Sequence, residues 1–258
     1  MFKDFLFFLY SICATTLEKL IFKKFTPKYN GNKLSDLGYE TMPLNEKINM
    51  NLADAKIIQI NPYLSKVQLS SNQIDNFIDD VFIRNNVFTF IRNRTGYNFC
   101  ISHITAYEIR HIPESESHLN FYANLWHKDG PYSKNTLKLV IPIEDIGSGN
   151  GPINIYPKKL SSEIPFYKFK FNGRLESYYA FEGKKYSKTL IFNPHSCFHR
   201  AGNPNPNLSR RQVVFQINPA PEWCVCKNIY DTQFDMEPKF PLLNYKLYDV
   251  KRLDMSNN

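Results

Sequence analysis

Residues 98–218 are rich in alternating apolar side chains, which predicts a mainly β fold with flanking helices. The clearest alternation runs through residues 137–143 and stops at the glycine-rich segment 147–151, which is a turn signal. The 21 phenylalanines and 16 tyrosines also suit a core built from strands. Together these observations predict a double-stranded β-helix, that is, a jelly roll or cupin-like barrel.

The N-terminal 25 residues combine apolar runs with scattered lysines. Residues 5–14 are apolar apart from Tyr10 and Ser11, and such a run is too short to cross a bilayer. A signal peptide is one interpretation, although it would need a more basic start than Lys3-Asp4. A helix packed on the barrel is the simplest interpretation, and a basic amphipathic helix at a membrane surface is the third. We therefore keep peripheral membrane contact through residues 1–25 as a hypothesis.

The next segments alternate between helical and extended patterns. Residues 74–82 carry apolar side chains at helical spacing, and the polar residues 70–72 before them suit a helix cap. We expect this helix to lie against the outside of the barrel. Residues 98–112 and 119–126 are typical of strands.

The chain is expected to form a single domain over residues 1–258, because a chain of this length that is 43% hydrophobic can bury a full core. We find no internal repeat, heptad run or low-complexity linker. Within the domain we expect residues 1–97 to form a helical N-terminal support and residues 98–218 the jelly-roll core. Residues 219–258 are expected to wrap around the barrel without chemistry of their own.

The amino-acid composition indicates the cellular compartment of the protein more clearly than its function. Five scattered cysteines, an odd number, predict free thiols in a reducing compartment, and thus a cytoplasmic location. Cys224-Val225-Cys226 has no second cluster, so a structural role is preferred to a metal or redox role. The net charge of +8 is spread along the chain, which indicates either a mildly basic surface or an anionic substrate. No segment combines a basic stripe with interleaved aromatics, so we expect no nucleic-acid partner.

The clearest candidates for functional residues are His127 and Asp129, which are separated by one residue. On an extended segment both side chains point to the same face, where they can share a metal ion. His199 follows a predicted strand and turn and is the third candidate ligand, with His195 on the same segment as its rival. Two imidazoles and one carboxylate form the ligand set of an open non-haem iron(II) site. The remaining histidines are interpreted as core-edge or solvent groups: His103, His111 and His118.

Arg210, with Arg211 directly after it, opens the apolar strand that follows the His199 segment, so an arginine should lie beside the metal. Three protein ligands leave three positions on an octahedral iron, of which 2-oxoglutarate would fill two and O2 the third. The far carboxylate of 2-oxoglutarate then needs a fixed cation. A guanidinium suits this role because it binds a carboxylate through two hydrogen bonds and keeps its charge.

Residues 126–216 resemble the phytanoyl-CoA dioxygenase-like branch of the iron(II)/2-oxoglutarate-dependent oxygenases. The resemblance is carried by four segments in the same order: Trp126-His127-Lys128-Asp129-Gly130, Asn150-Gly151-Pro152-Ile153 leading to Tyr156-Pro157, His199-Arg200-Ala201-Gly202, and Ser209-Arg210-Arg211. The arginine of this family falls eleven residues after its distal histidine, which implies Arg210 rather than Arg211. Two positions differ from the family. Lys158-Lys159-Leu160 replaces a frequent Gly-Ser-His segment, and Ala201 replaces a small hydroxyl residue that helps to hold 2-oxoglutarate.

The resemblance implies a dioxygenase that uses Fe(2+), 2-oxoglutarate and O2 to hydroxylate a small-molecule or acyl substrate, releasing succinate and CO2. The implied metal ligands are His127, Asp129 and His199, and Arg210 would bind the co-substrate.

A second hypothesis is a non-catalytic, cupin-like binding protein for a carbohydrate or a small acid, which would have no need of a carboxylate-binding arginine. The substrate itself is not specified by the sequence. Tyr107, Arg110 and Asn120 lie on predicted strands that lead to the metal, and they are our candidates for substrate contacts.

Overall fold

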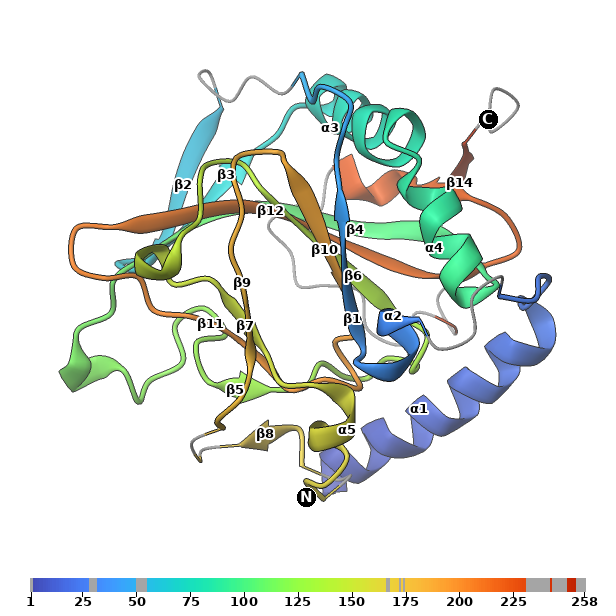
Figure 1. Ribbon diagram of the computed structural model, residues 1–258, viewed down its shortest axis with the longest axis horizontal. Coiled ribbons are helices and arrows are strands. Elements are labelled where there is room, and N and C mark those ends of the chain that lie inside the picture. The colour runs from blue at the N-terminus through green and yellow to red at the C-terminus, as the bar shows by residue number, and fades with distance from the viewer. Residues whose placement is uncertain are drawn as a thin grey trace.

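The computed structural model describes residues 2–27, 32–49, 55–165, 168–171, 173, 175–230, 242 and 250–253 (Figure 1). Its strands form a larger and a smaller sheet, in which antiparallel pairing dominates. The order in the larger sheet is β1 (Tyr39–Pro43), β10 (Lys188–Phe192), β6 (Leu137–Pro142), β12 (Ser209–Ala220), β4 (Asn98–Arg110), β13 (Cys224–Cys226) and β14 (Val250–Arg252). β3 (Leu64–Gln68) pairs with both β4 and β2 (Lys56–Asn61). The order in the smaller sheet is β8 (Lys170–Phe171), β5 (Trp126–His127), β11 (His199–Ala201), β7 (Ile153–Ile155) and β9 (Tyr179–Phe181).

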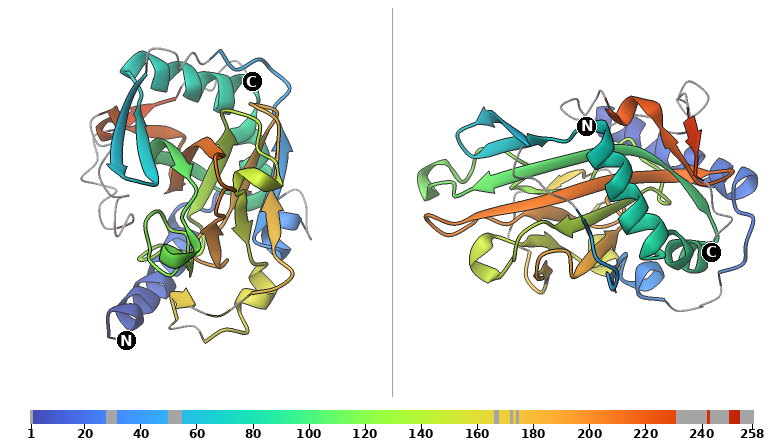
Figure 2. Two further views of the ribbon diagram at one scale, coloured as in Figure 1. Left: turned by 90° about the vertical axis from the view of Figure 1, so that its left-hand side faces the viewer. Right: turned by 90° about the horizontal axis from the view of Figure 1, so that it is seen from above.

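Helices flank these sheets (Figures 1 and 2). They are α1 (Phe2–Ile21), α2 (Lys33–Asp36), α3 (Ser71–Ile78), the π-helix η1 (Asp79–Arg84), α4 (Val87–Thr95) and α5 (Lys158–Ser161), with short 3-10 helices at η2 (Glu114–Glu116), η3 (Ser148–Asn150) and η4 (Lys227–Tyr230). The prediction of a mainly β fold with flanking helices is therefore confirmed.

Side-chain alternation along β12 explains how the larger sheet separates two cores. Val213 and Phe215 point to one face, where Phe215 stacks on Phe77 of α3 with ring centroids 5.5 Å apart. Val214 points to the other face and packs in a second cluster with Ile155 of the smaller sheet. Because strand side chains alternate with period two, the even-numbered residues of β12 face the space between the two sheets.

The helix expected over residues 74–82 is present, but it begins earlier and changes its winding. Ser70 caps α3, since its hydroxyl accepts a hydrogen bond from the Gln73 backbone amide and the Gln73 side-chain oxygen accepts one from the Ser70 backbone amide. From Asp79 the chain continues as a π-helix, whose end is marked by the Asn85 amide donating to the Asp80 carbonyl.

The strand expected over residues 119–126 is mostly absent, because β5 begins only at Trp126. Local side-chain hydrogen bonds hold the chain in turns instead. The Asn124 side chain accepts from the Phe121 amide at 2.9 Å and donates to the Leu119 carbonyl at 2.8 Å. Asparagine competes with a strand ladder in this way, which apolar alternation alone does not reveal.

Residues 1–97 are not purely helical, since β1, β2 and β3 all join the larger sheet. β1 pairs with β10, more than a hundred residues away, so its strand state depends on a distant partner. Of the expected C-terminal wrap, residues 219–230 complete β12 and form β13 and η4. Residues 231–241, 243–249 and 254–258 lie outside the described part of the chain.

Helix α1 is attached to the rest of the molecule along one face (Figure 1). The Ser11 hydroxyl lies 2.7 Å from Nε2 of His195, and the Thr15 hydroxyl accepts a hydrogen bond from the Lys134 amide at 2.9 Å. Glu18 is buried and accepts a hydrogen bond from the Asn135 side chain at 3.0 Å. The expected helix packed on the barrel is thus present. No helix among the described residues has the length and apolar character needed to cross a membrane.

Glu18 should make the stability of the protein depend on pH. Burial raises the pKa of this carboxyl to about 7, against an ordinary value of 4.5. The folded state therefore binds a proton that the unfolded state has lost, and the free energy of unfolding should fall by about 3 kcal/mol between pH 4.5 and 7. In Glu18→Gln this contribution should disappear. Denaturant titrations of both proteins across this range measure the difference, and the exposed Glu163→Gln provides a control whose pH profile should match the parent's.

Candidate metal centre

The two candidate histidine ligands are neighbours on the smaller sheet. His127 of β5 lies directly opposite His199 of β11 in the antiparallel register, and their ring centroids are 4.3 Å apart. Asp129 follows two residues after His127, where its amide donates to the Pro194 carbonyl at 2.8 Å. This hydrogen bond directs the chain after β5 so that the carboxylate returns to the two imidazoles.

The three side chains converge on a common point. His127 Nε2 lies 3.4 Å from Asp129 Oδ1, and His199 Nε2 lies 3.6 Å from Asp129 Oδ2. One ligand atom from each residue lies within 4.8 Å of the others, so together they could hold a metal ion. Spacings of this size are those of ligands that share one ion.

The second nitrogen of each imidazole is fixed by the backbone. His127 Nδ1 lies 2.8 Å from the Leu125 carbonyl, and His199 Nδ1 lies 3.1 Å from the Cys197 carbonyl. A carbonyl can only accept, so both Nδ1 atoms carry hydrogen and both Nε2 atoms present a lone pair toward Asp129. Burial, together with the neighbouring His127, lowers the pKa of His199 and favours the neutral form that binds metals.

His195, the rival to His199, lies outside this cluster. Its Nε2 faces Ser11 of α1, and its Nδ1 lies 3.2 Å from the backbone carbonyl of Asp129. Burial lowers the pKa of His195 to about 4. This imidazole therefore links α1 to the loop that carries Asp129, and the third member of the cluster is His199.

Lys138 is a charged member of the site that the sequence motifs did not predict. Its Nζ lies 2.7 Å from Asp129 Oδ2, and its side chain is only 10% exposed. Burial alone would raise the pKa of Asp129, but the Lys138 ammonium holds it well below its ordinary value. The sequence did carry a signal, because Lys138 is the sole charge in the apolar run of residues 137–143.

Arg210 and Arg211 point in opposite directions, as strand alternation requires. Arg211 is exposed and forms an ion pair with Glu108 at 2.5 Å. Arg210 is fully buried and donates from Nη1 to the Gly151 carbonyl. Its Nε and Nη2 have no hydrogen-bond partner in the described part of the chain.

A buried cation with two unsatisfied donor nitrogens is unfavourable unless an acceptor completes it. Burial lowers the pKa of Arg210, while Tyr107 and Tyr122 act in the opposite direction. A carboxylate would satisfy the unpaired donors with a matching planar geometry. The residues present at this position therefore fit an anionic ligand.

The backbone carbonyl that accepts the hydrogen bond from Arg210 belongs to a glycine, and the backbone conformation there requires one. Gly151 has φ of +64°, a left-handed value that other residues rarely adopt. A Cβ atom at this position would lie 2.4 Å from the Pro204 nitrogen. Close approach of two backbone segments thus explains the glycine in the Asn150-Gly151-Pro152 motif.

The candidate substrate residues separate into one that faces the interior and two that do not. Tyr107 lies opposite Gln212 in the β4–β12 register, and its hydroxyl accepts a hydrogen bond from the Gln212 side chain. Arg110 is exposed and pairs with Glu108 at 2.7 Å. Asn120 is exposed in a turn, where its side chain accepts from the Ala123 amide. Of the three, Tyr107 is the one that interacts with Arg210 in the interior, whereas the substrate roles of Arg110 and Asn120 stay predictions at exposed positions.

Several buried polar side chains on β4, the strand of Tyr107, and on the neighbouring β12 have an oxygen atom without a hydrogen-bond partner among the described residues. Gln212 Oε1, Gln216 Oε1 and Thr105 Oγ1 are buried without a hydrogen-bond partner among the described residues. All three belong to β4 and β12, and Thr105 lies opposite Val214, which faces the smaller sheet. Ala201, two residues after His199, packs in an apolar cluster with Ile109 and contributes no polar group. These three unpaired polar groups thus lie on the larger sheet, across from the candidate metal ligands.

Comparison with known proteins gives a fold but no family. No family model matches the chain, and no curated protein matches it. Among solved structures, the chain is similar to the non-haem alpha-ketoglutarate-dependent epimerase SnoN from nogalamycin biosynthesis. The TM-score is 0.50 at 11% identity over 73% of this chain and 80% of SnoN. HygX from Streptomyces hygroscopicus, with nickel and 2-oxoglutarate bound, gives a TM-score of 0.48 at 8% identity over 74% of this chain and 86% of HygX. The similarity to SnoN shows a shared fold.

Proposed function

We propose that this chain is an iron(II)- and 2-oxoglutarate-dependent dioxygenase of the double-stranded β-helix fold, close in type to the phytanoyl-CoA dioxygenase-like branch. Its reaction would convert R–H, 2-oxoglutarate and O2 into R–OH, succinate and CO2, with a small-molecule or acyl substrate. The observation that carries this proposal is the pairing of a His127–Asp129–His199 cluster with a buried, incompletely bonded Arg210. SnoN, which shares the fold, is described as alpha-ketoglutarate dependent, and this description supports the proposal.

Each residue has a defined part in this proposal. His127, Asp129 and His199 would hold the iron, with both imidazoles oriented by backbone carbonyls. Arg210 would bind the far carboxylate of 2-oxoglutarate and so fix its orientation. Iron held there, with 2-oxoglutarate and O2, would supply an oxidant for an unactivated C–H bond. Tyr107 and Gln212 lie beside Arg210 and would contact the co-substrate or the substrate.

We propose a reducing, cytoplasmic setting for this activity. Iron(II) requires reducing conditions, and the protein carries free thiols in its core. Cys100 and Cys226 are buried with their sulfur atoms 3.2 Å apart, while Cys224 packs in the same cluster. The CxC pair on β13 thus contributes to packing, which supports a structural role for it.

Anaerobic titration tests the proposal. Adding iron(II) and then 2-oxoglutarate to the metal-free protein should produce a visible charge-transfer absorption, and admitting O2 should release succinate slowly even without substrate. Zinc(II) should occupy the same site without supporting succinate release, because it is redox-inactive. Metal binding without any 2-oxoglutarate binding would favour the alternative, a cupin-like binding protein for a carbohydrate or small acid.

A further inference from the structure

The outer face of α1 is largely apolar, and the exposed Thr16 on it donates its hydroxyl to the Ile12 carbonyl at 3.0 Å. Its side chains are between 42% and 76% exposed at Phe5, Leu6, Leu9, Ile12, Leu17 and Leu20. At 100° per residue these positions lie on one side of the helix, opposite the buried Ser11, Ala14 and Glu18. No charged residue lies among them on this face.

Such a surface is unusual for a helix that faces water. Surface helices of globular proteins carry polar and charged side chains on the outer face. An exposed apolar patch larger than a few hundred Å² marks a site of interaction with a protein or a membrane. The outer face of α1, on a helix about 30 Å long, has the dimensions of such a patch.

The attachment of α1 determines how it can meet a partner. Phe7 packs edge-on against Phe169 with ring centroids 5.8 Å apart, and Ser11, Thr15 and Glu18 contact the body of the protein further along the helix. The helix is therefore held flat against the molecule from its first turns to its last. A helix in this position can lie in the plane of a membrane surface but cannot insert across it.

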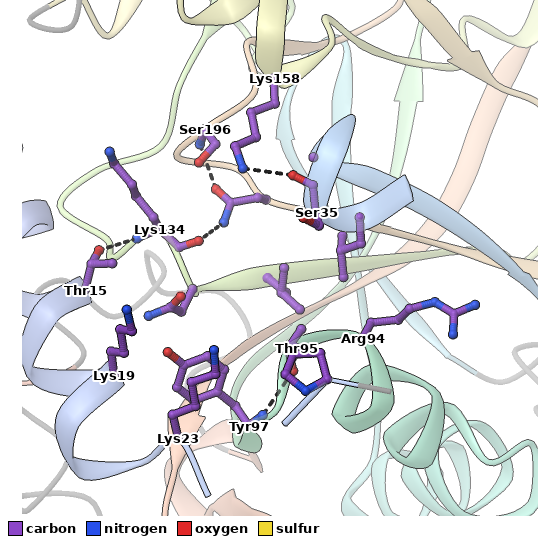
Figure 3. Close-up of a pocket in the computed structure, with 16 residues that line it drawn as sticks. Thr15, Lys19, Lys23, Ser35, Arg94, Thr95, Tyr97, Lys134, Lys158 and Ser196 are labelled. Atoms are coloured by element: carbon purple, nitrogen blue, oxygen red, sulfur yellow. Dashed lines mark hydrogen bonds between the residues drawn. The ribbon is translucent and has the colours of Figure 1, made fainter. Parts of the chain in front are cut away.

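A cationic cavity borders the same helix (Figure 3). It has a volume of about 380 Å³, and Thr15 and Lys19 line it from the flank of α1, with Lys23 from the segment directly after the helix. Lys134 and Lys158 line it from other segments. Among the described residues, no carboxylate forms an ion pair with any of these four lysines, whereas Arg94, also in the lining, is paired with Glu40 at 3.1 Å.

We propose that α1 seats the protein on an anionic membrane surface, with its outer face among the lipid chains and the cationic cavity around a lipid phosphate. Apolar side chains in the interface and lysines beside them are the combination by which interfacial helices bind anionic bilayers. The excess of lysine over acidic residues near the apolar face favours lipid over a second, equally basic copy of this chain.

Vesicle sedimentation with the metal-free, full-length protein tests this inference without reference to the iron site. Vesicles of phosphatidylcholine alone are compared with vesicles containing phosphatidylglycerol. We expect strong binding to the anionic vesicles and weak binding to the neutral ones. Leu9→Gln/Leu20→Gln should reduce binding at least tenfold through the lost apolar contacts. Its matched control is Ile57→Gln/Ile60→Gln on β2, at side chains exposed to a similar degree, which should bind like the parent.

The cavity is tested by Lys19→Ala/Lys23→Ala/Lys134→Ala. Each lysine near an anionic surface contributes about fivefold to binding, so this variant should bind phosphatidylglycerol vesicles about 100-fold more weakly. Lys56→Ala/Lys184→Ala/Lys185→Ala removes the same charge away from α1 and should retain most of the binding. Equal loss in the two lysine variants would overturn the role of the cavity. An absence of vesicle binding, with a dimer that Leu9→Gln/Leu20→Gln dissociates, would overturn the membrane proposal in favour of a second copy.

Discussion

Replacing Asp129 with alanine is expected to abolish succinate release and to weaken iron(II) binding by more than about 100-fold. Loss of a residue that merely supports a metal ligand costs about 10- to 100-fold in affinity, and Asp129 is itself a candidate ligand. It is also the one carboxylate in the cluster, which leaves two neutral imidazoles to hold a dication. Anaerobic iron titration and a succinate assay measure the two effects.

The same substitution should also destabilise the fold, because Asp129 is the partner of a buried cation. Removing it takes away the carboxylate that lies 2.7 Å from the Lys138 ammonium. Breaking a buried ion pair on one side costs about 3–5 kcal/mol. A lower melting temperature in Asp129→Ala would therefore not by itself distinguish a lost ligand from a lost ion pair.

A double variant separates these two roles. Asp129→Ala/Lys138→Met removes both charges and should recover most of the lost stability while remaining unable to release succinate. Lys138→Met alone keeps all three candidate ligands, and its iron(II) affinity should equal or exceed that of the parent, since a cation next to the site has been removed. Succinate release by the stable double variant would mean that Asp129 is not a ligand.

The three candidate metal ligands could be predicted because the spacing of two of them is local in the sequence and because iron(II) sites use a known set of ligand types. The His127-Lys128-Asp129 spacing specifies a shared face, and the chemistry of a third ligand indicated a histidine from another strand. The structure supplies what local patterns do not contain, namely the pairing of β5 with β11 that sets His127 opposite His199. Strand alternation likewise explains why Arg210 faces inward and Arg211 outward.

The errors arose where distant or competing interactions decide the conformation. β1 is a strand because β10 offers it a partner, and residues 119–126 form turns because Asn124 binds its own backbone neighbours. Asn120 was assigned to the pocket on the expectation of a strand over residues 119–126, whereas Arg110 does lie on β4 but on the face opposite to Tyr107. Lys138 was overlooked because its strand was read only for its apolar pattern, although a single charge within such a strand indicates a buried partner.

Replacing Arg210 with methionine should weaken 2-oxoglutarate binding by about 30-fold to several thousand-fold, corresponding to about 2–5 kcal/mol for a buried carboxylate that loses its partner. Iron(II) affinity should not change, because the three candidate ligands are untouched. The melting temperature should stay the same or rise, since the variant removes a fully buried charge whose Nε and Nη2 lack partners among the described residues. A residue kept only for structure would show the opposite, a lower melting temperature with normal co-substrate binding.

Arg211→Met is the matched control, because it makes the same change one residue away on the outer face of β12. Its guanidinium is exposed and paired with Glu108, so the variant should bind 2-oxoglutarate like the parent. Arg210→Lys should give intermediate affinity, since it keeps the charge but loses the planar fork. Calorimetric titration of 2-oxoglutarate into the iron- or zinc-loaded proteins measures all three. Normal affinity in Arg210→Met would remove 2-oxoglutarate from the proposal, and loss of affinity in Arg211→Met alone would mean that the other arginine binds it.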